Sequence, residues 1–308
     1  MTVIKTSGHE IELSNPGKEI FPDAGLTKKD LVEYYQRISE YILPYLEDRP
    51  MMLHRYPNGI DGKDFYQKEE PDYFPDWIDT IKVDVKKEGQ DKQEFVNCNS
   101  EATLLYCANQ ASITPHVWLS KKDNLRHPDR MIYDLDPPEG EFEVVRECAK
   151  DFRKLFEELE LNAFVMTTGS KGIHVVLSLD RKSGFEEVRQ FAKDVANLLA
   201  DRKPDNYTVE TLKKKRKGRL FLDYLRNSYG QTAVAPYSLR ARKGAPVATP
   251  LDWNEIGDKD LDSQSYHHGN IFRRLGSKND PWKDFFKKQN NLTKARKKLD
   301  EIIERNDE

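Results

Sequence analysis

The hydrophobic pattern of the chain switches repeatedly between the spacing of helices and that of strands. Apolar residues three and four positions apart predict helices over residues 27–46, 101–108, 142–160, 184–200 and 291–305. Thr27 is expected to cap the first helix, with Asp30 as its capping-box partner. Short runs of β-branched and apolar residues predict strands at residues 51–56, 79–85, 94–97, 130–135, 163–168, 173–179 and from 220 onward.

Two aspartates end the strand predicted at residues 130–135, directly before Pro137 and Pro138. Side chains at i and i+2 of a strand point to the same face, so Asp134 and Asp136 are expected to project side by side, with Cα atoms roughly 6.6 Å apart. That spacing lets both carboxylates reach one divalent ion, and a cation is the usual way to keep two adjacent carboxylates ionised. Asp-x-Asp before prolines is also typical of a turn in which Asp caps backbone amides, and the motif alone leaves both interpretations open.

A third carboxylate, Asp223, interrupts the apolar strand that begins at Leu220. A buried carboxylate without a partner is costly, so it requires either an ion pair or a metal. An ion pair with Arg226 is the simpler explanation. A metal shared with Asp134 and Asp136 would explain both unusual placements together.

A glycine-rich turn, Gly169-Ser170-Lys171-Gly172, separates two predicted strands. Thr168, Ser170, Lys171 and His174 would cluster there and offer amides, hydroxyls and a cation, which suits a triphosphate. The turn lacks the G-x-x-x-x-G-K-[ST] pattern of a P-loop. A glycine hairpin with a solvated lysine is the alternative.

Phe65 and Tyr66 are adjacent aromatics in a polar, proline-punctuated segment. Both cannot face a core, so one is expected to stack on nucleic-acid bases or to pack on its own loop. His116 lies before the aspartate strand, and a lone histidine of this kind is more often structural than catalytic.

Composition describes a hydrophilic chain of 308 residues, with 37% hydrophobic and 33% charged residues. That length accommodates two modules or one domain with two lobes. No apolar run approaches a membrane span, so a cytoplasmic location is expected. The three cysteines lack C-x-x-C spacing and are expected to be reduced core thiols. The net charge of −3 disfavours nucleic acid only mildly, because residues 213–219 form a basic run.

Four linked motifs resemble the polymerase module of bacterial ligase D, within the archaeo-eukaryotic primase superfamily. They are Asp-Leu-Asp-Pro, Thr-Gly-Ser-Lys-Gly-Ile-His, Phe-Leu-Asp-Tyr-Leu-Arg-Asn and Tyr-Ser-Leu-Arg-Ala-Arg, and the resemblance extends from about residue 13 to 253. It implies an α/β (α+β) fold with two lobes, the second RRM-like on a mostly antiparallel sheet. The implied divisions of this single catalytic domain are an N-terminal lobe to about residue 120, a catalytic lobe over about 121–258 and a helical extension over about 259–308. No ligase or nuclease motif follows, which suggests a stand-alone version.

The resemblance also assigns roles to individual residues. Asp134, Asp136 and Asp223 would be catalytic and bind two divalent ions, manganese or magnesium, with an NTP or dNTP as substrate. His116 would lie near the incoming sugar and favour ribonucleotides. Serine in the family stands where this chain has Thr168, and usually glycine where it has Ser170. The implied nucleotide-binding set is His116, Thr168, Ser170, Lys171, His174, Arg226, Asn227, Ser238 and Arg240.

For DNA, Lys18, Lys28 and Arg55 match a pocket for a recessed 5′-phosphate. The family tends to have lysine where this chain has His54, so phosphate affinity is expected to be weaker or pH-dependent. Phe65 and Tyr66 match a paired aromatic that stacks on the template, and Arg216 would contact the strand backbone.

The resulting hypothesis is a DNA-end-joining primase-polymerase that fills gaps and extends 3′ ends at double-strand breaks, preferring ribonucleotides. Its expected partners are gapped or overhanging DNA with a 5′-phosphate, nucleoside triphosphates, Ku and a separate DNA ligase. A replicative or mobile-element primase is the close alternative, because it shares the carboxylates but not the phosphate pocket. A metal-dependent nuclease and a non-catalytic end-binding module are more distant alternatives.

Overall fold

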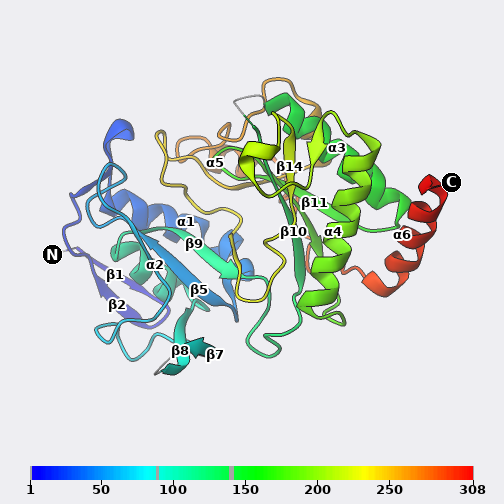
Figure 1. The fold of residues 1–308 in the computed structure, drawn as a ribbon. Helices are drawn as coiled ribbons and strands as arrows, with labels where there is room; N and C mark the ends of the chain where they lie inside the picture. The colour runs from blue at the N-terminus through cyan, green and yellow to red at the C-terminus, as the bar shows by residue number, and fades with distance from the viewer. Residues whose placement is uncertain (1, 88–89, 139–141, 308) are drawn as a thin grey trace. The chain divides into compact units, whose positions relative to one another are not determined.

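The structure, a computed structural model, describes residues 2–87, 90–138 and 142–307 (Figure 1). Its α-helices are α1 (Lys28–Leu46), α2 (Glu101–Asn109), α3 (Phe142–Glu158), α4 (Phe185–Arg202), α5 (Ile271–Ser277) and α6 (Leu292–Asp307). Short 3-10 helices span Pro22–Ala24 (η1), Lys213–Lys215 (η2) and Trp253–Gly257 (η3). Thr27 caps α1 through the expected capping box with Asp30. None of the helices described is long and apolar enough to cross a membrane.

The chain divides into two structural units. Unit 1 comprises residues 1–123, 232–248 and 266–272, and unit 2 comprises residues 124–231, 249–265 and 273–308. These limits differ from the sequence-based lobes because a later segment returns to unit 1. There β15 (Thr232–Val234) pairs with β9 (Ser112–Trp118), which places Val234 opposite His116.

Unit 1 is built on a mostly antiparallel sheet of strand order β15-β9-β5-β8-β7, with β6 added alongside β5. Its further strands are β5 (Pro50–Arg55), β6 (Phe65–Gln67), β7 (Thr80–Lys87) and β8 (Gln90–Asn97). Two small ribbons are β1 (Val3–Thr6) with β2 (His9–Glu12), and β3 (Glu19–Phe21) with β4 (Leu26–Thr27). Helix α1 packs against α2, and the Tyr34 hydroxyl donates to the Tyr237 carbonyl oxygen at 2.7 Å.

Unit 2 is built on a sheet of strand order β13-β14-β10-β12-β11-β16, in which only β13 and β14 pair in parallel. The strands are β10 (Arg130–Asp136), β11 (Ala163–Thr167), β12 (Ile173–Ser178), β13 (Tyr207–Thr208), β14 (Leu220–Asp223) and β16 (Thr249–Leu251). Helices α3 and α4 cover one face of this sheet (Figure 1). The buried Tyr133 ring lies 4.4 Å from that of Phe152, centroid to centroid, and its hydroxyl donates to the Ala192 carbonyl. Odd-numbered residues of β10 therefore face the helices.

The sequence-based elements agree with this architecture, and the α/β class is confirmed. Cys98, Cys107 and Cys148 are free and buried, as expected. One local expectation was wrong, because residues 65–67 form the edge strand β6 rather than a loop. Their backbone pairs with β5, which places Tyr66 opposite His54 and Phe65 opposite Arg55.

Candidate active site and nucleic-acid interface

The three candidate carboxylates lie on the same face of the unit 2 sheet. Asp134 and Asp223 are Cα partners in the antiparallel pairing of β10 with β14, and Asp136 follows Asp134 by two positions. Directly paired residues and residues two apart share a face of a sheet. This face is opposite to the one that holds Tyr133 and Leu135. The structure therefore brings together the residues that the sequence singled out from two distant strands.

Two nitrogen-bearing side chains, His174 and Arg226, lie beside Asp134. Its Oδ1 lies 3.3 Å from His174 Nε2, and its Oδ2 lies 3.3 Å from Arg226 NH2. His174 is the Cα partner of Asp134 on β12, and it is buried with its Nδ1 lacking a hydrogen-bond partner among the described residues. Arg226 pairs with Asp134, whereas the sequence suggested Asp223 as its partner.

Both other carboxyl groups have raised pKa values. Withdrawal from water and then the Asp134 carboxylate raise the pKa of Asp136. Withdrawal from water also raises the pKa of Asp223, against the opposing effect of the Leu225 amide, which donates to its Oδ1 at 2.8 Å. Such repulsion between carboxylates favours a bound cation, which would keep them ionised.

As the side chains lie, no group of three or more His, Cys, Asp or Glu residues is arranged to hold a metal ion within residues 2–87, 90–138 and 142–307. Asp134 is turned toward His174 and Arg226 instead. The donor set nevertheless fits a divalent cation, because carboxylate oxygens from neighbouring strand positions share one face. Burial, and after it the charge of Asp134, raises the pKa values of Asp136 and Asp223. Asp134, Asp136 and Asp223 are thus the residues that could hold such an ion.

The loop between β11 and β12 is fixed against the end of β10. The Thr168 hydroxyl accepts hydrogen bonds from the Ser170 and Gly172 amides, at 3.3 and 3.2 Å. A Cβ atom at Gly172 would lie 1.9 Å from the Leu135 carbonyl oxygen and 2.9 Å from Asp136 Oδ1, so only glycine allows this approach. This contact keeps the loop beside the end of β10, where Lys171 and Asp136 line the same cleft.

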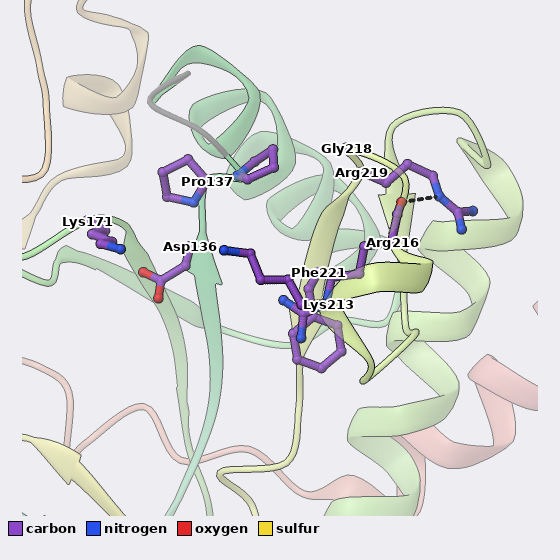
Figure 2. A pocket seen from close by; sticks show the side chains of 9 residues that line it. Asp136, Pro137, Lys171, Lys213, Arg216, Gly218, Arg219 and Phe221 are labelled. Atoms are coloured by element: carbon purple, nitrogen blue, oxygen red, sulfur yellow. Dashed lines mark hydrogen bonds between the residues drawn. The ribbon is translucent and has the colours of Figure 1, made fainter.

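A basic cleft of about 520 Å³ opens beside Asp136 (Figure 2). Its charged lining comprises Asp136, Lys171, Lys213, Arg216 and Arg219, with Pro137, Pro138, Gly218 and Phe221 completing it. Figure 2 shows the Lys213 amino group directed toward Asp136. From the basic run at residues 213–219, the sequence analysis assigned a DNA contact to Arg216 alone. Lys213 belongs to the same run, and its positive charge was the feature that could have identified it as a second candidate.

Asn227 and Arg216, which the resemblance assigns to nucleotide and DNA binding, also form hydrogen bonds that hold the surrounding backbone. Asn227 is fully buried; its Oδ1 accepts from the Ile132 amide, and its Nδ2 donates to the carbonyls of Ile132 and Tyr224. It therefore anchors β10 rather than presenting its amide to a nucleotide. The Arg216 guanidinium donates to the Glu210 and Thr211 carbonyls and lies 4.0 Å from the centroid of the Phe221 ring. These contacts brace the basic loop.

The remaining nucleotide-binding candidates belong to unit 1. His116 is on β9, with its ring centroid 6.0 Å from that of Tyr66 and 6.2 Å from that of His54. Ser238 is buried, and its hydroxyl has no hydrogen-bond partner among the described residues. The Arg240 amide donates to the Pro246 carbonyl, which fixes the segment that follows β15.

Lys18, Lys28 and Arg55 of unit 1, the residues predicted for a phosphate pocket, lie near one another. Burial lowers the pKa of Lys28, and the neighbouring charges of Lys18 and Arg55 lower it further. Lys28 Nζ donates to Ser14 Oγ at 2.8 Å, and Lys18 Nζ donates to Asn58 Oδ1 at 2.9 Å. This mutual repulsion among cations would be relieved by an anion.

Phe65 and Tyr66 lie on opposite faces of β6, and both are about half exposed. Tyr66 stacks on His54 with ring centroids 3.9 Å apart, whereas Phe65 lies beside Arg55, whose guanidinium carbon is 5.4 Å from the ring centroid. Tyr73 was missed by the sequence analysis. It is 58% exposed, and its hydroxyl accepts a hydrogen bond from Arg55 NH1 at 2.6 Å. The sequence feature that could have identified it is an aromatic residue in the same polar segment as Phe65 and Tyr66.

His54 differs from a phosphate-binding lysine in charge as well as shape. Burial lowers its pKa, Asp64 raises it in part, and the charges of Arg240 and Arg242 lower it. Its Nε2 lies 2.6 Å from Asp64 Oδ2. A histidine with a lowered pKa is mostly neutral at pH 7, so His54 supports Tyr66 and adds little positive charge.

Comparisons with known proteins agree on one family. The model of the LigD primase-polymerase domain matches residues 27–282. The bifunctional non-homologous end joining protein LigD of Bacillus subtilis is 30% identical over 90% of this chain and 44% of its own length. The multifunctional non-homologous end joining protein LigD of Pseudomonas aeruginosa is 32% identical over 89% of this chain and 33% of its own length. The chain thus spans less than half the length of these relatives.

A solved structure extends the agreement to the fold. The polymerase domain of Mycobacterium tuberculosis Ligase D in complex with DNA is similar with a TM-score of 0.84 and 30% sequence identity. The match covers 91% of this chain and 99% of that domain.

Proposed function

Because the chain belongs to the LigD primase-polymerase domain family, whose members are DNA-directed nucleotidyltransferases, we propose that it fills gaps and extends DNA 3′ ends during end joining. The observation that carries this proposal is the shared face of Asp134, Asp136 and Asp223, with the Thr168–Gly172 loop fixed beside Asp136. Divalent ions held by the three aspartates, manganese or magnesium, would activate the primer 3′-hydroxyl and neutralise the departing pyrophosphate.

The chain's own residues would bind and orient the nucleotide. Lys171 and the loop amides would hold the triphosphate, with Arg226 beside Asp134 as a further cation and His174 as a further hydrogen-bonding group. The 3′-oxygen would then attack the α-phosphorus as the bond to pyrophosphate breaks. Thr168 and Ser170 complete the proposed triphosphate-binding loop of unit 2. In unit 1, the proposal assigns contacts with the nucleotide to Ser238 and Arg240 and the selection of ribose to His116.

Binding to a recessed 5′-phosphate is supported by the cation cluster in unit 1. Burial lowers the pKa of Lys28, and the charges of Lys18 and Arg55 lower it further, so three basic groups lie close together there. A phosphate group placed among them would form charge-assisted hydrogen bonds. This pocket favours an end-joining polymerase over a replicative primase. The proposal also includes Ku and a separate DNA ligase as partners, and a cytoplasmic location.

Gap filling on a labelled primer tests the proposal. The substrates are ATP or UTP against the matching deoxynucleotides, with and without a 5′-phosphate across the gap, in manganese or magnesium. We expect templated addition that is faster with ribonucleotides and with the phosphate. Synthesis on single-stranded DNA without a primer would indicate a replicative primase, and shortening of the primer would indicate a nuclease.

A further inference from the structure

We propose that Ser263 and Gln264 are positioning residues that hold the Thr168–Gly172 loop in its nucleotide-binding geometry. Ser263 Oγ and Gln264 Nε2 both donate to the Ser170 carbonyl oxygen, at 3.0 and 2.8 Å. The two donors lie more than 90 positions later in the chain, yet they meet on a single carbonyl of the loop. The inference rests on the proposed function of this loop as a triphosphate site.

The two donors are presented by an ordered turn. The Asp262 amide donates to Ser265 Oγ at 2.8 Å, and the Gln264 amide donates to Asp262 Oδ1 at 2.6 Å. Ser263 is 7% exposed, so its hydroxyl is held inside unit 2. A turn fixed in this way loses little side-chain freedom when it binds the Ser170 carbonyl.

Ser263 and Gln264, together called the clamp, bind the Ser170 carbonyl, a part of the loop that the other contacts do not fix. Gly172 is fixed by its close approach to Leu135, and the Ser170 and Gly172 amides are fixed by the Thr168 hydroxyl. The Ser170 carbonyl belongs to the peptide that carries the Lys171 nitrogen. Lys171 lines the cleft beside Asp136 (Figure 2), so a rotation of this peptide would move its cation away from the bound phosphates.

Ser263 and Gln264 and the proposed 5′-phosphate pocket are in different parts of the chain. Ser263 and Gln264 belong to unit 2, whereas Lys18, Lys28 and Arg55 belong to unit 1. Loss of the hydrogen bonds from Ser263 and Gln264 should therefore weaken nucleotide binding and leave the gain in DNA affinity from a 5′-phosphate unchanged. A general loss of structure would instead reduce both.

The test compares a Ser263→Ala/Gln264→Met double variant with the full wild-type chain in gap filling. We expect the KM for the nucleoside triphosphate to rise about tenfold, as for the loss of two hydrogen bonds of ordinary net strength, while kcat changes less than about twofold. Ser263→Thr retains a hydroxyl and should behave as wild type. Asp260→Asn changes an exposed residue of the same segment and is the matched control. If the double variant unfolds, Gln264→Met alone carries the test, because Gln264 is exposed.

Hydrogen exchange separates this inference from the proposed function. Without nucleotide, the amides of residues 170–172 should exchange faster in the double variant than in the wild type. If the folded double variant has an unchanged KM, or if these amides exchange at the wild-type rate, the proposal that Ser263 and Gln264 hold the loop is wrong. If the wild-type chain extends no primer, the proposed function fails, while the exchange measurement still decides whether Ser263 and Gln264 hold the loop.

Discussion

Asp134 and Asp223 are direct Cα partners across β10 and β14, so two carboxylates that are far apart in sequence face each other on one sheet surface. This pairing has an energetic consequence, because withdrawal from water and the Asp134 charge raise the pKa of Asp223. A carboxyl whose pKa is raised in the folded state binds its proton more tightly there than in the unfolded chain. It therefore reduces stability as the pH rises from its ordinary value of 3.8 through the folded-state pKa.

Asp223→Asn should consequently leave the metal-free protein at least as stable as wild type at pH 7, and should remove its response to manganese. A ligand at 100 times its Kd stabilises the folded state by about 2.7 kcal/mol, which corresponds to a Tm increase of roughly 5 °C. We expect that increase in the wild type and in the exposed control Asp201→Asn. Equal manganese responses in all three proteins, measured by thermal unfolding, would exclude Asp223 as a ligand.

The opposite placement of Phe65 and Tyr66 predicts separable effects on DNA binding. Phe65 contacts Arg55, so Phe65→Ala and Arg55→Ala should be non-additive in the affinity for 5′-phosphorylated gapped DNA. Tyr66→Ala should be additive with Arg55→Ala, and should weaken binding of template overhangs by about 1–3 kcal/mol. Fluorescence titrations of the single and double variants give both coupling energies. Strong coupling of Tyr66 with Arg55 would contradict the assignment of the two rings to separate surfaces.

His54 should matter for DNA binding through its ring rather than its charge. The lowered pKa of His54 means that it is neutral at pH 7, so His54→Gln should not alter the change in DNA affinity between pH 7 and pH 8. Loss of the stacked ring under Tyr66 should weaken overhang binding by about 0.5–1.5 kcal/mol at both pH values. An imidazole NMR titration checks the pKa directly, and a value above 6.5 would refute this explanation.

An ion-pair cluster in unit 2 should make the stability of the fold sensitive to acid. Burial opposes ionisation of Glu255, but hydrogen bonds from Arg274, the Asp252 amide and Lys278 outweigh it and lower the pKa to about 2. A lowered pKa gives stability that is complete above the ordinary value of 4.5 and is lost as the pH falls toward 2.

Glu255→Gln should therefore reduce the free energy of unfolding by on the order of 1–2 kcal/mol at pH 7, after allowance for solvent screening. Urea unfolding at pH 7 and pH 3 measures the change, and the difference from wild type should shrink at the lower pH. The exposed pair formed by Lys5 and Glu10 supplies a control, because Glu10→Gln should have little effect at either pH. A deficit that does not depend on pH would mean that packing, and not charge, explains the role of Glu255.

Local sequence patterns were sufficient to predict the long helices, most strands of the unit 2 sheet and the shared face of Asp134 and Asp136. The period of two in β10 placed Asp134 and Asp136 on one face, and the capping residues placed the start of α1. The register of Asp134 with Asp223 could not be predicted, because strands far apart in the chain are aligned by packing of the whole sheet. Contacts between distant segments also could not be predicted. The turn at residues 262–265 contacts the Ser170 carbonyl, and Asn227 bonds the backbone of Ile132 as well as the nearby Tyr224 carbonyl. The edge strand β6 was missed because its residues gain a strand conformation only by pairing with β5.

The most direct test of the carboxylate site is single-nucleotide addition to a gapped primer by wild type and Asp136→Asn, with DNA binding measured on the same preparations. Asp136 is the last residue of β10, and asparagine has nearly the shape of aspartate, so the substitution should not disturb the fold. Wild-type addition in manganese, its loss by at least about a hundredfold in Asp136→Asn, and equal DNA affinity are the predicted results. Undiminished addition by a folded Asp136→Asn would contradict the account, because the reaction would then proceed without the carboxylate on which it depends.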